Sequence, residues 1–342
     1  MKIDNIKTLR GSPDDVLYKI KSVMMGHAVG DALGVPVEFK SREELERDPV
    51  TDMRGYGTYD VPRGCWSDDT SMSLAALDAL SREDWSWESV MDNFVSWLES
   101  GEYTPTGKSF DVGSTCLKAI KKYCENDFSA KDCGCDDEYS NGNGSLMRIH
   151  PFALYGYYAF LLNSEKNDGY WFWMAWLKRA SELTHAHERS VMACYIYGYC
   201  LSFVLKDPTL KGLRAGIKFA GDDLNYLPEH EHFSRIFDPD FEKLAADEIK
   251  STGYVVDTLE AALWCLLTTD SYEKCVLKAV NLGRDTDSVA AIAGGIAGAI
   301  YGYDSIPKEW LDALMRREYI ENACRKARES WLGEDIPLSD ER

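Results

Sequence analysis

Two short acidic segments, far apart in the sequence, have similar compositions. Ser67-Asp68-Asp69-Thr70 and Asp285-Thr286-Asp287-Ser288 each combine carboxylates with hydroxyl groups. These oxygens are hard ligands of the kind that Mg²⁺ and Mn²⁺ prefer. If the fold brings the two segments together, they predict a site for a pair of divalent cations.

Each acidic segment also has a simpler interpretation as the start of a helix. Asp, Ser and Thr are favoured N-cap residues, and acids in the first turn complement the helix dipole. A cap needs only one side-chain oxygen, however, and neighbouring carboxylates repel one another unless a cation, a donor or water offsets the repulsion. The occurrence of two such segments therefore favours a metal site.

Two glycine-containing segments are predicted to form loops. Residues 26–34 read Gly-His-Ala-Val-Gly-Asp-Ala-Leu-Gly and lead through Pro36 to Glu38; the glycines either admit a ligand or end a helix with a turn. Residues 141–148 read Asn-Gly-Asn-Gly-Ser-Leu-Met-Arg. This second segment favours either a tight turn with left-handed residues or a backbone cradle for a sugar or phosphate. Arg148 fits a phosphate contact or a structural ion pair with a carboxylate.

His185 and His187 do not form an obvious zinc site. They are two residues apart, so their side chains would diverge on a helix. His185 is interpreted as a buried, hydrogen-bonded histidine or as a contact to a base or ribose.

The ten cysteines are scattered along the chain, which shows no secretory signal pattern. This predicts a reducing, cytoplasmic setting rather than a disulfide framework. Cys133 and Cys135 lack a second Cys or His pair at zinc spacing and are predicted to lie in a surface loop.

Composition excludes two classes of partner. The chain has 342 residues, 45% of them hydrophobic, and a formal charge of -19. It can therefore form a large core, but it lacks the basic surface that a nucleic-acid binder uses to displace counterions from phosphate. The longest uncharged apolar stretch, residues 288–303, is shorter than the ~20 residues of a membrane-spanning helix. Neither nucleic acid nor a membrane is expected as a partner.

Helical periodicity dominates the pattern of apolar residues, and no run of alternating β-branched residues occurs. We predict an all-α, compact multi-helix fold, with a single domain over residues 1–332 and a polar tail over 333–342. The segments with helical spacing are 16–29, 71–80, 89–98, 114–123, 171–183, 190–204, 258–267, 272–281 and 288–301.

The segment after Asp287 is rich in glycine and alanine. Gly294, Gly298 and Gly302 fall four residues apart. Glycine costs a helix about 0.8–1.0 kcal/mol relative to alanine, so this pattern implies close approach by other helices. We predict a central helix whose N-terminus carries Asp285 and Asp287 into the middle of the fold.

Several motifs together resemble the ADP-ribosylglycohydrolase family over nearly the whole chain. Each motif is weak alone, but their number and order make the resemblance specific. The motifs are Gly30-Asp31-Ala32-Leu33-Gly34 followed by Pro36 and Glu38, Trp66-Ser67-Asp68-Asp69-Thr70, Asn143-Gly144-Ser145-Leu146-Met147-Arg148, Thr184-His185, Gly253-Tyr254-Val255-Val256-Asp257-Thr258-Leu259-Glu260, and Gly283-Arg284-Asp285-Thr286-Asp287-Ser288.

The resemblance implies an all-α fold with a binuclear Mg²⁺ or Mn²⁺ centre. Ser67 and Ser288 stand where relatives often carry Thr, and serine keeps the hydroxyl ligand. Arg284 stands where many relatives have Gly, and it either adds charge near the site or faces solvent. The residues at the family's metal-ligand positions are Ser67, Asp68, Asp69, Asp285, Asp287 and Ser288.

The resemblance also implies a reaction: hydrolysis of the bond between ribose C1 and a side chain of an ADP-ribosylated protein, with ADP-ribose as product. The catalytic candidates are Asp69 or Asp287 as the general base and Glu38 as a carboxylate acting on the leaving group or on water. Asp31 is expected to support the first loop or to serve as an interior hydrogen-bond acceptor.

The same resemblance predicts the residues that bind the adenosine diphosphate part of the substrate. Arginine is the expected linkage. The alternatives are ADP-ribosyl-serine, O-acetyl-ADP-ribose, and a catalytically inactive ADP-ribose-binding relative. The predicted substrate-binding residues are Asn143, Gly144, Ser145, Met147, Arg148, His185 and Tyr254.

Overall fold

The computed structural model describes residues 12–125, 129–162 and 168–332. Within these ranges the chain folds into helices joined by loops and 3-10 turns, and the β-structure consists of two isolated bridges. The all-α prediction is confirmed. The predicted tail, residues 333–342, lies outside the described residues, and a single domain over residues 1–332 stays a prediction.

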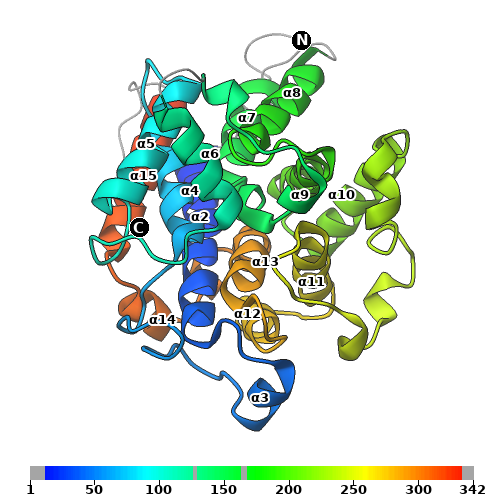
Figure 1. Cartoon of the computed structure of the whole chain (residues 1–342). Helices are drawn as coiled ribbons and strands as arrows, with labels where there is room; N and C mark the ends of the chain where they lie inside the picture. The colour runs from blue at the N-terminus through cyan, green and yellow to red at the C-terminus, as the bar shows by residue number, and fades with distance from the viewer. Residues whose placement is uncertain (1–11, 126–128, 163–167, 333–342) are drawn as a thin grey trace.

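Two helices form the centre of the fold, α2 (Pro13–Gly34) and α13 (Thr286–Tyr301). They run side by side through the middle of the molecule, drawn in blue and orange (Figure 1), and pack more extensively than any other described pair of helices. The prediction of a central Gly/Ala-rich helix therefore agrees with the position of α13.

Glycines of α2 account for the close packing against α13. A Cβ added at Gly26 would lie 2.3 Å from the carbonyl oxygen of Gly294, and one added at Gly30 would lie 2.2 Å from that of Ala290. At the end of α2, a Cβ on Gly34 would lie 2.3 Å from the backbone nitrogen of Asp287. Only glycine permits these approaches.

The prediction of a loop over residues 26–34 is wrong. The helix continues through these residues to Gly34, because contact with α13 outweighs the low helix propensity of glycine. The glycines therefore admit a neighbouring helix rather than a ligand.

The remaining helices surround the central pair. The predicted helical segments are found with boundaries shifted by a few residues, while α3, α7, α10, α14 and α15 were not predicted. The apolar face of α15 is interrupted by many charged residues, and α10 contains glycines that weaken its pattern. The bounds are α3 (Arg42–Arg47), α4 (Asp68–Leu80), α5 (Trp87–Ser100), α6 (Ser114–Cys124), α7 (His150–Gly156), α8 (Asp168–Glu182), α9 (Glu188–Lys206), α10 (Leu210–Asp223), α11 (Val255–Leu267), α12 (Tyr272–Val280), α14 (Lys308–Ala313) and α15 (Arg317–Leu332).

No helix in the described part of the chain combines the length and the apolar character needed to cross a membrane.

Gly294→Ala should destabilise the fold, because its new Cβ would lie 2.3 Å from the carbonyl oxygen of Gly26. Backbone atoms cannot rotate away, so the helices must separate. We expect a loss of about 1–3 kcal/mol in the free energy of unfolding, measured by urea denaturation. The control is Gly295→Ala, whose Cβ first meets the Tyr197 hydroxyl, at 2.9 Å and at the end of a side chain. Equal losses for both variants would contradict the importance of the backbone contact.

Candidate active site

Both acidic segments begin helices, and the fold brings them together. Ser67 is the N-cap of α4, and Asp285 is the N-cap of α13. The Ser288 hydroxyl donates a hydrogen bond of 3.1 Å to Oδ2 of Asp69, which also accepts one of 3.2 Å from the Ser67 hydroxyl. The segments are therefore both helix starts and parts of one polar cluster.

Helix α2 positions both acidic segments. The Asp31 carboxylate accepts hydrogen bonds from the backbone N–H of Ser67 at 2.9 Å and from the hydroxyl of Thr70 at 2.6 Å. On the other side, the Thr286 hydroxyl donates to the carbonyl oxygen of Gly34 at 2.8 Å. Burial raises the pKa of Asp31 to about 6, although its donors oppose the shift. The prediction that Asp31 acts as an interior acceptor is confirmed.

A carboxylate that the sequence analysis missed joins this cluster. Glu38, Asp111 and Asp287 each place one carboxylate oxygen within 4.8 Å of the other two. Asp111 lies in the loop before α6, half-buried and with φ of 54°. A single acid in a loop has no distinctive pattern; the one available signal is its place two residues before Gly113, the N-cap of a helix.

Three of the buried carboxylates each have one oxygen without a hydrogen-bond partner. Oε2 of Glu38, Oδ1 of Asp69 and Oδ2 of Asp287 are buried without a hydrogen-bond partner. Burial, followed by repulsion from neighbouring carboxylates, raises the pKa of Asp69 and Asp287 well above the usual value and that of Glu38 to about 10. A divalent cation would offset both costs, so these oxygens fit the predicted metal ions.

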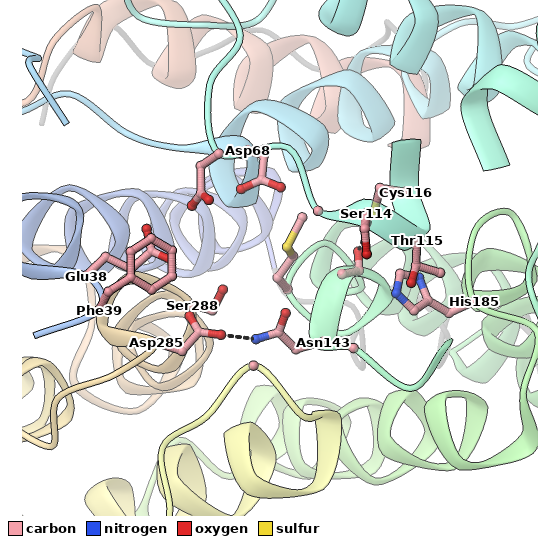
Figure 2. Close-up of a pocket in the computed structure, with 16 residues that line it drawn as sticks. Glu38, Phe39, Asp68, Ser114, Thr115, Cys116, Asn143, His185, Asp285 and Ser288 are labelled. Atoms are coloured by element: carbon pink, nitrogen blue, oxygen red, sulfur yellow. Dashed lines mark hydrogen bonds between the residues drawn. The ribbon is translucent and has the colours of Figure 1, made fainter. Parts of the chain in front are cut away.

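One cavity of about 220 Å³ connects the acidic cluster with the second polar region of the site. Asp68 and Asp285 line it together with Glu38, Asp111 and Ser288, which we call the acidic end. Figure 2 shows Glu38, Asp285 and Ser288 on one side of the cavity and Cys116, Thr115 and His185 on the other.

The far end of the cavity is formed by the first turn of α6. Gly113, Ser114, Thr115 and Cys116 line it, and the N-cap Gly113 provides no side-chain hydrogen bond to the helix. Free N–H groups at a helix N-terminus, together with the helix dipole, favour an anion such as a diphosphate. No Lys or Arg is among the described residues that line the cavity. This helix was predicted from the sequence, but its place in the cavity lining was not.

The predicted substrate loop, residues 141–148, is only partly in the cavity. Asn143, Gly144 and Met147 line it, and the Asn143 side chain donates a 2.8 Å hydrogen bond to Oδ2 of Asp285. The loop forms a 3-10 turn without positive φ angles, so the prediction of left-handed residues is wrong. Glycine is needed at 144 for space, because a Cβ would lie 2.7 Å from Sγ of Cys116.

Arg148 lies behind the cavity rather than in it. Its buried guanidinium donates to the carbonyl oxygen of Ala180 at 2.9 Å and to the hydroxyl of Thr184 at 2.6 Å. The same hydroxyl lies 2.8 Å from Nδ1 of His185. Neither hydrogen-bond partner of Arg148 is a carboxylate or faces the cavity, so the structure places Arg148 as a support for His185.

His185 lines the cavity as a neutral, hydrogen-bonded side chain. Burial, with the Arg148 charge in addition, lowers the pKa of His185 to about 3. It is not on a helix, as the spacing argument assumed, but pairs with Cys135 in a β-bridge. Ser145 is fully buried and accepts a 3.0 Å hydrogen bond from the hydroxyl of Ser181, so its side chain points away from the cavity lining.

Tyr254 lies at the edge of the site as the N-cap of α11 and is not among the residues that line the cavity. Its backbone forms an antiparallel bridge with Gly142. Its half-buried ring lies beside Arg189, which also donates 2.7 Å hydrogen bonds to Glu138 and Glu229. Arg189 was not predicted from the sequence, and its hydrogen bonds connect the segments that carry Glu138 and Glu229.

A family model described as ADP-ribosylglycohydrolase matches residues 12–336 of the chain. The chain belongs to the ADP-ribosylglycohydrolase family. The resemblance found in the motifs is therefore confirmed.

Comparisons with individual proteins agree with this family assignment. It is 32% identical over 311 residues to the ADP-ribosylarginine hydrolase Tri1 of Serratia proteamaculans (strain 568), covering 91% of this chain and 79% of the relative. It is 31% identical over 293 residues to the ADP-ribosyl-[dinitrogen reductase] glycohydrolase of Rhodospirillum rubrum, covering 85% and 88%. A solved structure titled ADP-ribosylglycohydrolase-related protein complex superposes with a TM-score of 0.76 at 27% identity, covering 93% of this chain and 100% of that one.

Arg284 occupies a backbone position that favours glycine. Arg284 is exposed and has φ of 67°, a left-handed conformation that favours glycine. Its carbonyl oxygen accepts a 2.6 Å hydrogen bond from the N–H of Phe39, and its own N–H donates to the carbonyl oxygen of Lys40 at 2.7 Å. Of the two expectations for Arg284, the structure agrees with the one that it faces solvent.

Arg284→Gly should stabilise the protein by about 1 kcal/mol. The left-handed conformation costs a non-glycine residue about 1–2 kcal/mol, and the extra freedom of glycine in the unfolded chain cancels about 0.4–1 kcal/mol of the gain. Urea denaturation measures the difference. Arg284→Ala removes the charge but keeps Cβ, so it should give no gain. A gain of equal size for alanine would attribute the effect to charge instead of backbone strain.

Asp287→Asn should raise the melting temperature of the protein in chelator, because it removes one of the mutually repelling buried carboxylates. It should also remove most of the stabilisation by Mn²⁺, which for the parent is about 2.7 kcal/mol at a hundred times the Kd. Differential scanning calorimetry with and without Mn²⁺ measures both effects. Asp270→Asn, at an exposed carboxylate paired with Lys274, serves as the control. A full Mn²⁺ shift in Asp287→Asn would remove Asp287 from the metal site.

Proposed function

We propose that this protein is a metal-dependent hydrolase that releases ADP-ribose from modified arginine side chains by cleaving the N-glycosidic bond. The observation that carries the proposal is the cavity itself, which joins a carboxylate cluster to the free N-terminus of α6. A sugar diphosphate needs both: oxygen ligands for cations at the sugar and N–H donors for the diphosphate. The similarity to the ADP-ribosylarginine hydrolase Tri1 supports arginine as the linkage.

The two ends of the cavity define how the substrate would lie. The ribose that carries the scissile bond is assigned to the acidic end, beside Asp68 and Asp285. The diphosphate is assigned to the first turn of α6, because no Lys or Arg lines the cavity in the described part of the chain. The adenosine then extends towards His185, with Tyr254 at the edge.

The metal site is assigned to the N-termini of α4 and α13. Two Mg²⁺ or Mn²⁺ ions would supply positive charge that holds the ribose hydroxyls and makes a bound water more acidic. The unpartnered oxygens of Asp69 and Asp287 support this assignment. The residues proposed to hold the ions are Ser67, Asp68, Asp69, Asp285, Asp287 and Ser288.

We assign the general base to Asp111, in place of the earlier candidates Asp69 and Asp287. Asp111 lines the cavity and is half-buried, whereas Asp69 and Asp287 are 1% exposed and do not line it. Asp111 accepts a proton from water as the water oxygen bonds to ribose C1. The C1–N bond breaks, and the leaving guanidine nitrogen takes a proton from Glu38. Glu38 is not among the residues proposed to hold the ions, and burial raises the pKa of its carboxyl, which favours the protonated form.

The carboxylates also favour the reaction electrostatically. Cleavage leaves oxocarbenium-like positive charge on C1, and Asp68, Asp111 and Asp285 line the end of the cavity assigned to the ribose. The cytoplasmic setting and the absence of nucleic-acid and membrane partners stay predictions from the sequence.

The proposal is tested with proteins ADP-ribosylated separately on arginine, serine and glutamate, with released ADP-ribose measured by mass spectrometry. Release from arginine is expected. Asp68→Ala should remain folded by circular dichroism and lose turnover at least about 100-fold, because it removes an oxygen ligand. Asp270→Asn should keep the parent rate.

Other outcomes of this experiment select other functions. Release from serine alone, or hydrolysis of O-acetyl-ADP-ribose alone, would replace the arginine assignment. Binding of ADP-ribose without any release would identify an inactive binding protein. Turnover by Asp68→Ala at the parent rate in chelator-treated buffer would contradict the metal-dependent mechanism.

A further inference from the structure

Phe39 is an exposed hydrophobic residue inside a polar cavity. Its side chain is 63% exposed and lines the cavity directly after Glu38. It is not among the described side chains that pack against the hydrophobic core. An exposed aromatic ring gains little from burial, so packing does not account for this residue.

The backbone of Phe39 adopts a conformation that costs free energy. Its φ of 65° lies in the left-handed region, which a bulky residue rarely adopts. The conformation is held by the hydrogen bond from its N–H to the carbonyl oxygen of Arg284 at 2.6 Å. The preceding carbonyl, that of Glu38, accepts a 2.6 Å hydrogen bond from the hydroxyl of Thr58. A strained backbone that is fixed on both sides is typical of a functional position.

The surroundings of the ring specify the chemistry that it suits. Figure 2 shows Phe39 beside Glu38, on the same side of the cavity as Asp285 and Ser288. Asp111, the assigned base, lines the same cavity as Phe39, and its negative charge near an exposed aromatic face suits a cation that is planar and weakly hydrated. Guanidinium has these properties and stacks on aromatic rings, whereas a serine hydroxyl offers neither charge nor a planar face.

We propose that Phe39 is a specificity-determining residue, whose ring stacks on the guanidinium of the substrate arginine and favours guanidinium-linked over serine-linked ADP-ribose. This inference rests on the proposed function. It places the leaving group between the ring of Phe39 and the carboxyl of Glu38, the group assigned to protonate it.

The test compares Phe39→Leu and Phe39→Trp in the Mn²⁺-loaded enzyme, with an ADP-ribosyl-arginine peptide as substrate. Loss of the aromatic face should lower kcat/KM about 5- to 30-fold, while tryptophan should keep it within about threefold of the parent. Tyr56→Leu is the matched control: Tyr56 is 58% exposed with φ of 61° and does not line the cavity. Equal losses for Phe39→Leu and Tyr56→Leu, or no loss for either, would overturn the proposal.

A binding measurement separates this inference from the proposed function. Calorimetry of the Mn²⁺ enzyme saturated with ADP-ribose measures binding of agmatine, which carries a guanidinium, against butylamine, which does not. The parent should prefer agmatine, and Phe39→Leu should lose that preference. A parent that releases no ADP-ribose from arginine but shows this preference contradicts the function alone. Equal preference in parent and Phe39→Leu, or none in the parent, refutes the role of Phe39.

Discussion

The direct backbone contact between α2 and α13 brings the two acidic segments and Glu38 together. The contact ends at Gly34, whose Cα lies against the backbone of Asp287. One turn earlier on α2, Asp31 holds the backbone and hydroxyl of Thr70 at the start of α4. Just beyond the helix, Glu38 joins Asp287 in the acidic cluster. A single helix end thus connects the first acidic segment to the second.

This arrangement places a strong electrostatic constraint on the fold. Several buried carboxylates face one another in a chain of formal charge -19. Their repulsion opposes folding, and the hydrogen bonds from Ser67, Ser288 and Asn143 relieve it only in part. The backbones of α2 and α13 are in van der Waals contact at their glycines, and this packing resists separation of the two acidic segments. The same rigidity keeps the oxygens close enough to share cations.

The sequence predicted those parts of the site that have a local pattern. The acidic segments and the Gly/Ala-rich helix were recognisable because composition and spacing reveal them. The continuation of α2 through Gly26 and Gly30 was not, because only the partner helix explains why glycine is tolerated there. Asp111 and the open N-terminus of α6 were missed for a related reason: their importance comes from what faces them across the cavity.

Arg148 illustrates the opposite error, in which a residue near a motif is taken to share its function. Chain continuity places it next to the substrate loop, but the turn at residues 143–145 directs it inward to Thr184. Its guanidinium then contacts Thr184, which is hydrogen-bonded to His185, and does not line the cavity. Sequence proximity therefore predicts which loop forms the site better than it predicts which side chains face the ligand.

Backbone strain concentrates around the acidic end. Of the six non-glycine residues with positive φ in the described ranges, Asp111 belongs to the carboxylate cluster, and Phe39 and Arg284 are next in sequence to Glu38 and Asp285. Each such conformation costs free energy of about 1–3 kcal/mol, and it persists only where surrounding contacts fix it. The Phe39–Arg284 hydrogen bond is one such contact, and it connects the segment carrying Glu38 to the segment carrying Asp285. The free energy of these strained conformations is supplied when the protein folds, so the carboxylates need little rearrangement when a substrate binds. Such preorganisation of charged groups is what makes electrostatic catalysis effective.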